Sequence, residues 1–228
     1  MKSLGIILSR KNSKRLKKKN LLKIGNKTLI EKTIISAVKS KCFEKIIVSS
    51  DDLKIKSIVK KYSRKVDFHF RPSSLAQDNT KAIEVVIFLL KMFSNYDTVS
   101  LLLPTCPFRT SQDIQKAFKI FNKNYKNTLS VTDYDFPPEF ALKKKGGFYS
   151  PIKDSPLLKN KTRSQEFISS LRPNGAIYIS LVSNLFKNKN FYVKEMNIYK
   201  MSKIKSIDID TKLDFELAKL IYKKYEKK

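Results

Sequence analysis

The sequence is short of the residue types on which several common active sites depend. Its 228 residues include two cysteines, Cys42 and Cys106, and one histidine, His69. Two cysteines are too few for a disulfide framework or a cysteine-based metal site. We expect an ordinary structural or surface role for His69 and find no Ser–His–Asp or Cys–His arrangement around it.

Glycine and long apolar runs are also scarce. With 5 glycines in the chain, the loop after the first apolar run has none where a Walker P-loop or a GxGxxG fingerprint needs them. No apolar run approaches the ~20 residues that cross a bilayer, and no signal peptide precedes the first predicted strand. We therefore expect a cytoplasmic protein without membrane insertion.

Acidic residues are far outnumbered, and the formal net charge is +28. This charge raises the possibility of nucleic-acid binding. However, 41 of the 48 cations are lysines spread along the whole chain, and only 7 are arginines. Arginine is the usual residue for bidentate phosphate and guanine contacts. We therefore favour an incidentally basic surface and expect no nucleic-acid partner.

Short apolar runs alternate with stretches of helical periodicity. Strands are predicted at 3–8, 45–49, 66–68, 98–103, 129–132, 175–179 and 207–210. Helices are predicted from 29 to 38, 55 to 62 and 83 to 93, then from an N-cap at Ser111 to 121, and after a cap at Thr211. In the last helix, the inner face is predicted to hold Leu213, Leu217, Leu220 and Ile221. This alternation predicts one three-layer α/β domain with a mainly parallel sheet.

The regular alternation is interrupted between residues 134 and 171. Prolines and glycines break this stretch, and no long helix fits it. We interpret it as a small irregular insertion that leaves the main sheet and returns to it.

The loop after the first strand is dense in cations. It carries Arg10, Ser13, Lys14, Arg15 and Lys19. Loops at the carboxyl ends of strands are where α/β folds place ligands, and this loop is suited to a polyphosphate. A solvated basic loop is the alternative interpretation.

Two acidic residues alternate in Ile207-Asp208-Ile209-Asp210. Alternation places Asp208 and Asp210 on one face of a strand, where their repulsion calls for a cation. Mg²⁺ binds one or two carboxylates together with substrate phosphates. Alternatively, Asp210 caps the last helix.

Two of the rare arginines lie near the end of the irregular segment, in Arg163-Ser164-Gln165 and Arg172-Pro173-Asn174-Gly175. They could clamp a substrate carboxylate. An ion pair between loops or subunits is the alternative.

Six blocks along the chain, taken together, resemble the CMP-sialic acid synthetases (acylneuraminate cytidylyltransferases). In order, they begin at Ser9-Arg10-x-x-Ser13-Lys14-Arg15-Leu16-x-x-Lys19-Asn20, Val48-Ser49-Ser50-Asp51-Asp52, Phe70-Arg71-Pro72-x-x-Leu75-Ala76-x-Asp78, Pro104-Thr105-Cys106-Pro107-Phe108-Arg109, Arg172-Pro173-Asn174-Gly175 and Ile207-Asp208-Ile209-Asp210.

The resemblance implies a Rossmann-like nucleotidyltransferase that transfers CMP from CTP to a nine-carbon 2-keto sugar acid and releases pyrophosphate. It implies that the insertion serves dimerisation in a homodimer and that Mg²⁺ or Mn²⁺ binds Asp208 and Asp210. The nucleotide would be held by Arg10, Ser13, Lys19, Asn20 and Arg71, and the sugar acid by Arg163, Gln165, Arg172 and Asn174. We expect Arg10, Lys19 and Asp210 to act in catalysis.

The sequence departs from the family pattern at two places. Lys11-Asn12 stands where relatives usually carry two glycines, and lysine adopts a left-handed backbone poorly. Leu103 replaces a glutamine near the sugar, which favours a legionaminic-like acid over ordinary sialic acid. Two alternatives stay open: a cytidylyltransferase for the eight-carbon acid Kdo, and a non-catalytic nucleotide- or nucleic-acid-binding protein.

Overall fold

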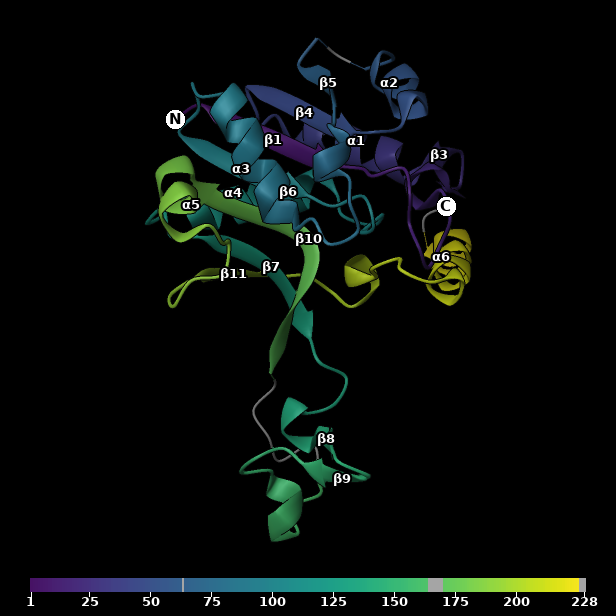
Figure 1. The fold of residues 1–228 in the computed structure, drawn as a ribbon, viewed down its shortest axis with the longest axis vertical. Coiled ribbons are helices and arrows are strands. Elements are labelled where there is room, and N and C mark those ends of the chain that lie inside the picture. Colours follow the sequence, from purple (N-terminus) through teal and green to yellow (C-terminus); the bar gives the residue numbers. More distant parts are fainter. Residues whose placement is uncertain (63, 164–169, 226–228) are drawn as a thin grey trace.

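A seven-stranded sheet forms the centre of the protein (Figure 1). The computed structural model describes residues 1–62, 64–163 and 170–225. The strand order is β11-β7-β10-β6-β1-β4-β5, and every neighbouring pair is parallel except the two that involve β10. The strands are β1 (Ser3–Leu8), β4 (Lys45–Ser50), β5 (Val66–Phe70), β6 (Thr98–Leu102), β7 (Thr128–Asp133), β10 (Leu171–Leu181) and β11 (Asn197–Lys200). The predicted mainly parallel sheet is confirmed.

Helices cover both faces of this sheet. Neighbouring residues of β1 point to opposite sides, so Ile7 joins the core under one set of helices and Ile6 the core under the other. The first set is α1 (Leu29–Ser40), α2 (Leu53–Val59) and α4 (Ser111–Phe121), and the second is α3 (Ala82–Met92) and α5 (Val182–Asn188). Burial on both faces explains why the inner strands are continuous apolar runs. In the described part of the chain, no helix is long and apolar enough to cross a bilayer.

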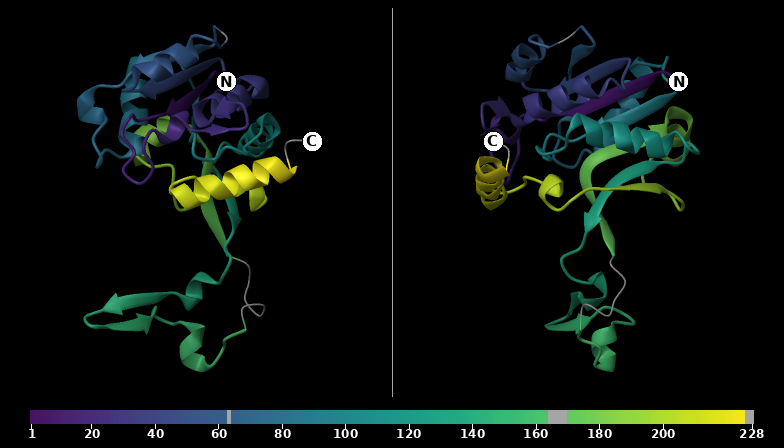
Figure 2. Two further views of the ribbon diagram at one scale, coloured as in Figure 1. Left: turned by 90° about the vertical axis from the view of Figure 1, so that its right-hand side faces the viewer. Right: turned by 180° about the vertical axis from the view of Figure 1, so that it is seen from behind.

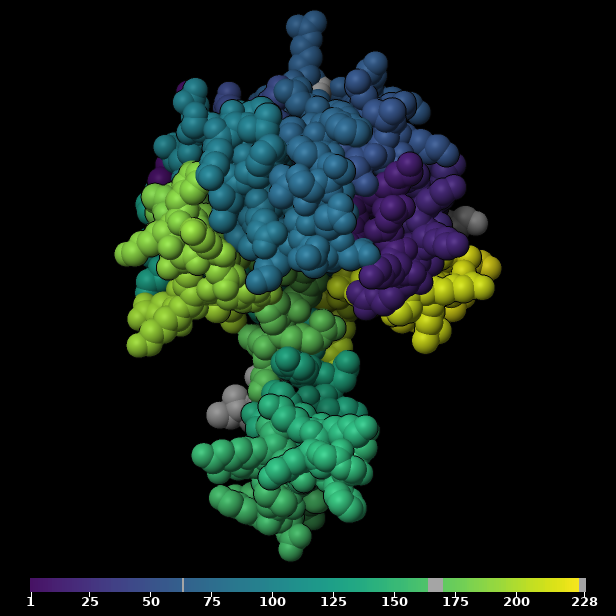
Figure 3. All heavy atoms as spheres, in the orientation of Figure 1, coloured from purple at the N-terminus to yellow at the C-terminus, as the bar shows by residue number. Residues whose placement is uncertain are grey.

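An arm projects from one end of the sheet (Figures 1 and 3). It leaves the body after β7 and returns at β10, and Figure 3 shows a narrow neck between arm and body. The arm contains η3 (Pro138–Phe140), β8 (Leu142–Lys145), β9 (Phe148–Pro151) and η4 (Pro156–Lys159). Its large apolar side chains are unusually exposed: Phe148 is 81% and Tyr149 68% accessible.

The C-terminal helix α6 (Lys212–Tyr225) packs beside a small hairpin formed by β2 (Lys23–Ile24) and β3 (Lys27–Thr28), as Figure 2 lets the reader follow. Gly25 turns the hairpin at φ +66°, and a side chain there would meet the Tyr222 hydroxyl at 2.3 Å. This close approach fixes which side of the helix faces the body.

The inner face predicted for α6 is wrong in part. Leu213, Leu217 and Leu220 are 77%, 48% and 66% exposed, whereas Ala218 is buried and Ile221 packs beside it. The helix carries two apolar stripes, and Tyr222 docking on Gly25 turns the other one inward. Periodicity alone cannot choose between two such stripes.

Two local predictions also need correction. Residues 207–210 form no strand, although the Ile209 amide donates to the Thr105 carbonyl at 2.9 Å. The N-cap of α4 is Thr110, not Ser111: the Thr110 hydroxyl accepts from the Asp113 amide and the Asp113 carboxylate accepts from the Thr110 amide. By contrast, Thr211 does cap α6, because its hydroxyl accepts from the Asp214 amide at 3.3 Å.

Candidate active site

A hollow of about 530 Å³ opens at the carboxyl ends of β1 and β6. The chain runs from β1 outward to β4 and β5 and then returns to the other side of β1 with β6, so this is a topological switch point of the sheet. The predicted nucleotide-binding residues all line the hollow: Arg10, Ser13, Lys19, Asn20 and Arg71. Asp210, Thr80, Leu103 and Thr105 line it as well. The predicted nucleotide-binding residues thus come from two separate parts of the chain, and the hollow as a whole is lined by five.

The loop after β1 needs no left-handed residue at the positions where glycines were expected. Among the described residues, the non-glycine positions with positive φ do not include Lys11 or Asn12. The Lys11 amide instead donates to the Asp51 carboxylate at 2.7 Å. The left-handed residue of this loop is Lys18, at φ 53°. The expected conformational difficulty at Lys11-Asn12 is therefore absent.

Asp210 is held by two cations of that loop. The Lys19 Nζ lies 2.7 Å from Asp210 Oδ1, and an Arg15 guanidinium nitrogen lies 2.7 Å from Oδ2. Lys19 is the more enclosed cation, with 14% of its side chain exposed against 67% for Arg15. Since Thr211 caps α6, the alternative interpretation of Asp210 as the helix cap is wrong.

Asp208 lies close enough to Asp210 for the two carboxylates to repel each other. Burial raises the pKa of Asp208 above its ordinary value, and the neighbouring Asp210 carboxylate raises it further. A hydrogen bond with Thr105 acts in the opposite direction. The Asp208 residue as a whole is exposed to solvent, but its carboxyl group is surrounded by enough protein atoms to lose part of its hydration. A second carboxylate whose ionisation is disfavoured fits a divalent cation, which would relieve the repulsion.

Asn20 and Arg71 are buried walls of the hollow. Asn20 donates through Nδ2 to the Ser9 hydroxyl at 2.9 Å, and its Oδ1 has no hydrogen-bond partner among the residues that the structure describes. Arg71 donates to the Ser49 carbonyl at 2.7 Å. Burial lowers the pKa of Arg71 to about 10, and Arg10 also lowers it. Asn20 thus has an acceptor atom left for a ligand, and Arg71 stays positively charged at neutral pH.

The predicted sugar-acid residues are not brought together in the single chain. Arg163 lies on the arm and Arg172 near the neck, on β10, where it pairs in register with Thr132. Gln165 lies outside the described residues. None of Arg163, Arg172 and Asn174 lines the hollow.

Asn174 is buried among its own partners instead. Its Oδ1 accepts from the Ser130 hydroxyl at 2.6 Å, and its Nδ2 donates to the Ser206 hydroxyl at 2.9 Å. Its backbone carbonyl accepts from the Cys106 thiol at 3.1 Å. Asn174 therefore ties the loop after β6 to η6 (Ile204–Ser206), the turn that ends two residues before Asp208. This geometry supports a positioning role rather than direct contact with a sugar.

Two further residues of the site were missed from the sequence, Thr105 beside Asp208 and Asp78, and Arg15 was predicted only as a loop cation and not as a partner of Asp210. Asp78 lines the hollow and lies 3.1 Å from Arg10 and 2.8 Å from Lys14. All three residues belong to the six sequence blocks, and this was the signal in the sequence that could have pointed to them as site residues. Their partners could not be assigned, because each lies far away in sequence.

Comparison with known families places this site in context. A family model described as "Cytidylyltransferase" matches residues 4–227. The chain belongs to the cytidylyltransferase family. This confirms the family that the six blocks predicted.

Relatives within the family differ in length. An N-acylneuraminate cytidylyltransferase of Escherichia coli is 34% identical over 98% of this chain, which spans 52% of that protein. A CMP-N,N'-diacetyllegionaminic acid synthase of Legionella pneumophila is 33% identical over 96% of this chain and 95% of its own length. A solved CMP:2-keto-3-deoxy-manno-octonic acid synthetase complexed with CTP has a TM-score of 0.71 at 14% identity, covering 98% of this chain and 99% of the other. The last likeness confirms the Rossmann-like nucleotidyltransferase fold.

Proposed function

We propose that this cytidylyltransferase transfers CMP from CTP to the anomeric hydroxyl of a nine-carbon 2-keto sugar acid and releases pyrophosphate. The observation that carries the proposal is the hollow at the switch point, where cations from the first loop meet Arg71 and Asp210. Two relatives above 30% identity bear names of CMP transfer to such acids. Leu103 in the wall of the hollow favours a legionaminic-like acid over N-acetylneuraminate.

The hollow suits phosphoryl transfer, in which positioning and charge neutralisation supply most of the catalysis. The sugar hydroxyl attacks the α-phosphorus as the bond to pyrophosphate breaks in line with it. Arg10 and Lys19 would neutralise the phosphates, and Asn20 and Arg71 would orient the nucleoside. Asp208 and Asp210 would hold Mg²⁺ or Mn²⁺, which supplies further neutralisation of the triphosphate.

The sugar-acid half of the site would be completed by a second copy of the chain. The arm carries Arg163 away from its own hollow, and its apolar side chains are exposed. Exposed apolar clusters of this kind are typical of interaction surfaces. We therefore propose a homodimer, acting in the cytoplasm, in which each arm brings Arg163 to the partner's site.

Pyrophosphate release tests this proposal. CTP and Mg²⁺ are offered with N-acetylneuraminic, legionaminic, pseudaminic and Kdo acids, and UTP and ATP serve as nucleotide controls. Release with one nine-carbon acid and CTP supports the proposal. Release with Kdo alone would favour the eight-carbon alternative, and DNA binding without any CTP response would favour the non-catalytic one.

A further inference from the structure

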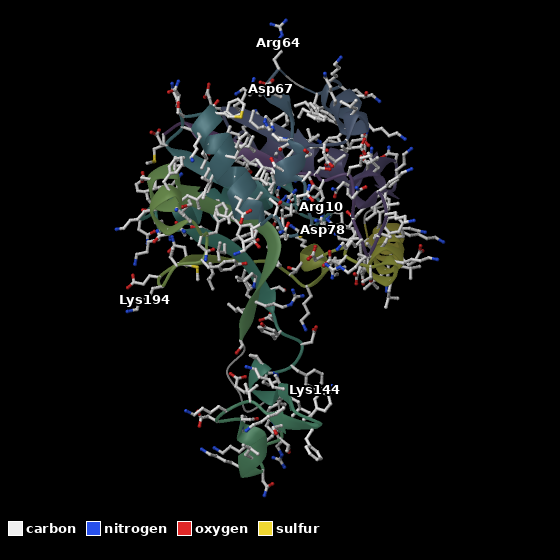
Figure 4. The ribbon with its side chains drawn as sticks, in the orientation of Figure 1. Arg10, Arg64, Asp67, Asp78, Lys144 and Lys194 are labelled. Carbon is white, nitrogen blue, oxygen red and sulfur yellow. The ribbon has the colours of Figure 1, made fainter. Side chains whose placement is uncertain are left out.

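Two carboxylates occupy the cations of the first loop in the structure. Asp210 pairs with Lys19 and Arg15 on one side, and Asp78 pairs with Arg10 and Lys14 on the other. Figure 4 shows Arg10 and Asp78 side by side in the middle of the molecule. The proposed metal site accounts for Asp210, but the proposed function gives Asp78 no role.

Asp78 pairs with Arg10, one of the cations that the proposed function assigns to the triphosphate. It comes from the segment between η2 (Ser73–Leu75) and α3, and it lines the same hollow as the two cations it contacts. A hydrogen bond from Lys14 lowers the pKa of Asp78, and the charge of Arg10 adds to this. The carboxylate is therefore ionised at neutral pH and presents the same oxygen chemistry to Arg10 that a phosphate presents.

We propose that Asp78 is a built-in competitor of the triphosphate for Arg10 and Lys14. The inference rests on the proposed function and concerns how that site binds and releases its nucleotide. CTP displaces Asp78 when it binds, which weakens CTP binding. After transfer, Asp78 returns to the two cations and favours departure of pyrophosphate.

The expected effect is modest because these groups are partly exposed. The side chains of Arg10 and Asp78 are 37% and 47% accessible, and that of Lys14 is 74% accessible. Exposed ion pairs contribute little each, so removing this competitor should strengthen triphosphate binding about two- to tenfold. Added salt should reduce the difference, because it screens exposed charges.

Asp78→Asn and a matched control, Asp67→Asn, separate local competition from a general change in charge. Asp67 pairs with Lys45 and its side chain is 50% exposed, close to the 47% of Asp78. It lies near the far end of the body from Arg10 (Figure 4). Calorimetric titration of each full-length protein with CTP, inorganic tripolyphosphate and cytidine gives three dissociation constants per variant.

We expect Asp78→Asn to lower the dissociation constants for CTP and tripolyphosphate two- to tenfold and to leave that for cytidine unchanged. Asp67→Asn should leave all three unchanged. Equal or weaker tripolyphosphate binding by Asp78→Asn, or equal tightening by Asp67→Asn, would overturn the inference. Tripolyphosphate binding without CTP binding would contradict the proposed function and not the role of Asp78, so the two failures are distinguishable.

Discussion

The two halves of the proposed site are built in different ways. The nucleotide half is assembled within one chain, from loops that end parallel strands of a rigid sheet. The sugar-acid half is dispersed: Arg163 lies on a projecting arm and Arg172 near the neck of that arm.

The difference shows what a sheet edge can and cannot do. Parallel strands place the loops at their carboxyl ends within reach of one another, whatever the loop sequences are. An arm outside the sheet has no such framework, so its residues need another surface to complete a site. The first two predictions below test this division by affecting one half at a time.

Lys19→Ala should have the largest effect. Lys19 is the more enclosed of the two cations that hold Asp210, and loss of a preorganised charge that faces a transferred group costs about 10²- to 10³-fold in turnover. Lys17→Ala is the matched control, because Lys17 is exposed in the same loop and does not line the hollow. Pyrophosphate release measures the loss, and far-ultraviolet circular dichroism shows that both variants fold. Equal turnover in the two variants would contradict the role of Lys19.

Arg163→Ala should affect the other half alone. We expect turnover at limiting sugar acid to fall at least about tenfold, because a charged clamp for the carboxylate is lost. The dissociation constant of CTP should stay within about twofold of wild type. Lys161→Ala, two residues away on the arm, is the control. Weaker CTP binding by Arg163→Ala would mean that the two halves are not separate.

Asn174→Ala sharpens the comparison at the junction of the two halves. The substitution leaves the buried Ser130 and Ser206 hydroxyls with one partner fewer, and we expect a loss of about 3 kcal/mol in the free energy of unfolding. Urea unfolding measures it. We also expect a higher Mg²⁺ requirement, because η6 precedes Asp208. Unchanged stability with weaker sugar-acid binding would instead restore the predicted sugar contact.

Asp113→Asn should have a smaller effect that depends on pH. Burial by itself raises the pKa of Asp113, but hydrogen bonds from Thr110, Lys205 and Tyr199 outweigh it and hold the pKa below its ordinary value. A carboxylate whose pKa is lowered in the folded protein stabilises the fold at any pH above its ordinary pKa. This stabilisation is lost as the pH falls through the lowered pKa of the folded state. At pH 7 we expect Asp113→Asn to lower the free energy of unfolding by about 2 kcal/mol. A difference from wild type that did not shrink in acid would contradict this explanation.

The fold was largely predictable because its signals are local. Continuous apolar runs mark strands buried on both faces, and helical spacing marks their covers. Elements whose conformation depends on contacts with distant parts of the chain were not predicted correctly. Helix α6 turns its other apolar stripe inward because Tyr222 packs against Gly25. Residues 207–210 bond to Thr105 without joining a sheet.

The candidate site divides along the same line. The residues of the first loop and Arg71 were predicted from ordered motifs that carry them, and the switch point brings them together in one hollow. The pairing of Asp78 with Arg10 and of Arg15 with Asp210 joins residues 68 and 195 positions apart, which no local pattern encodes. The buried bonds of Asn174 likewise depend on tertiary packing.

Mixing two impaired variants tests the central claim most directly, that one chain supplies the nucleotide half and its partner the sugar-acid half. Lys19→Ala has an intact arm and Arg163→Ala has an intact hollow, so a mixed dimer holds one complete site. After co-expression in equal amounts, we predict recovery of about one quarter of wild-type turnover, since half of the dimers are mixed. Turnover no higher than that of the two variants measured separately would contradict the claim.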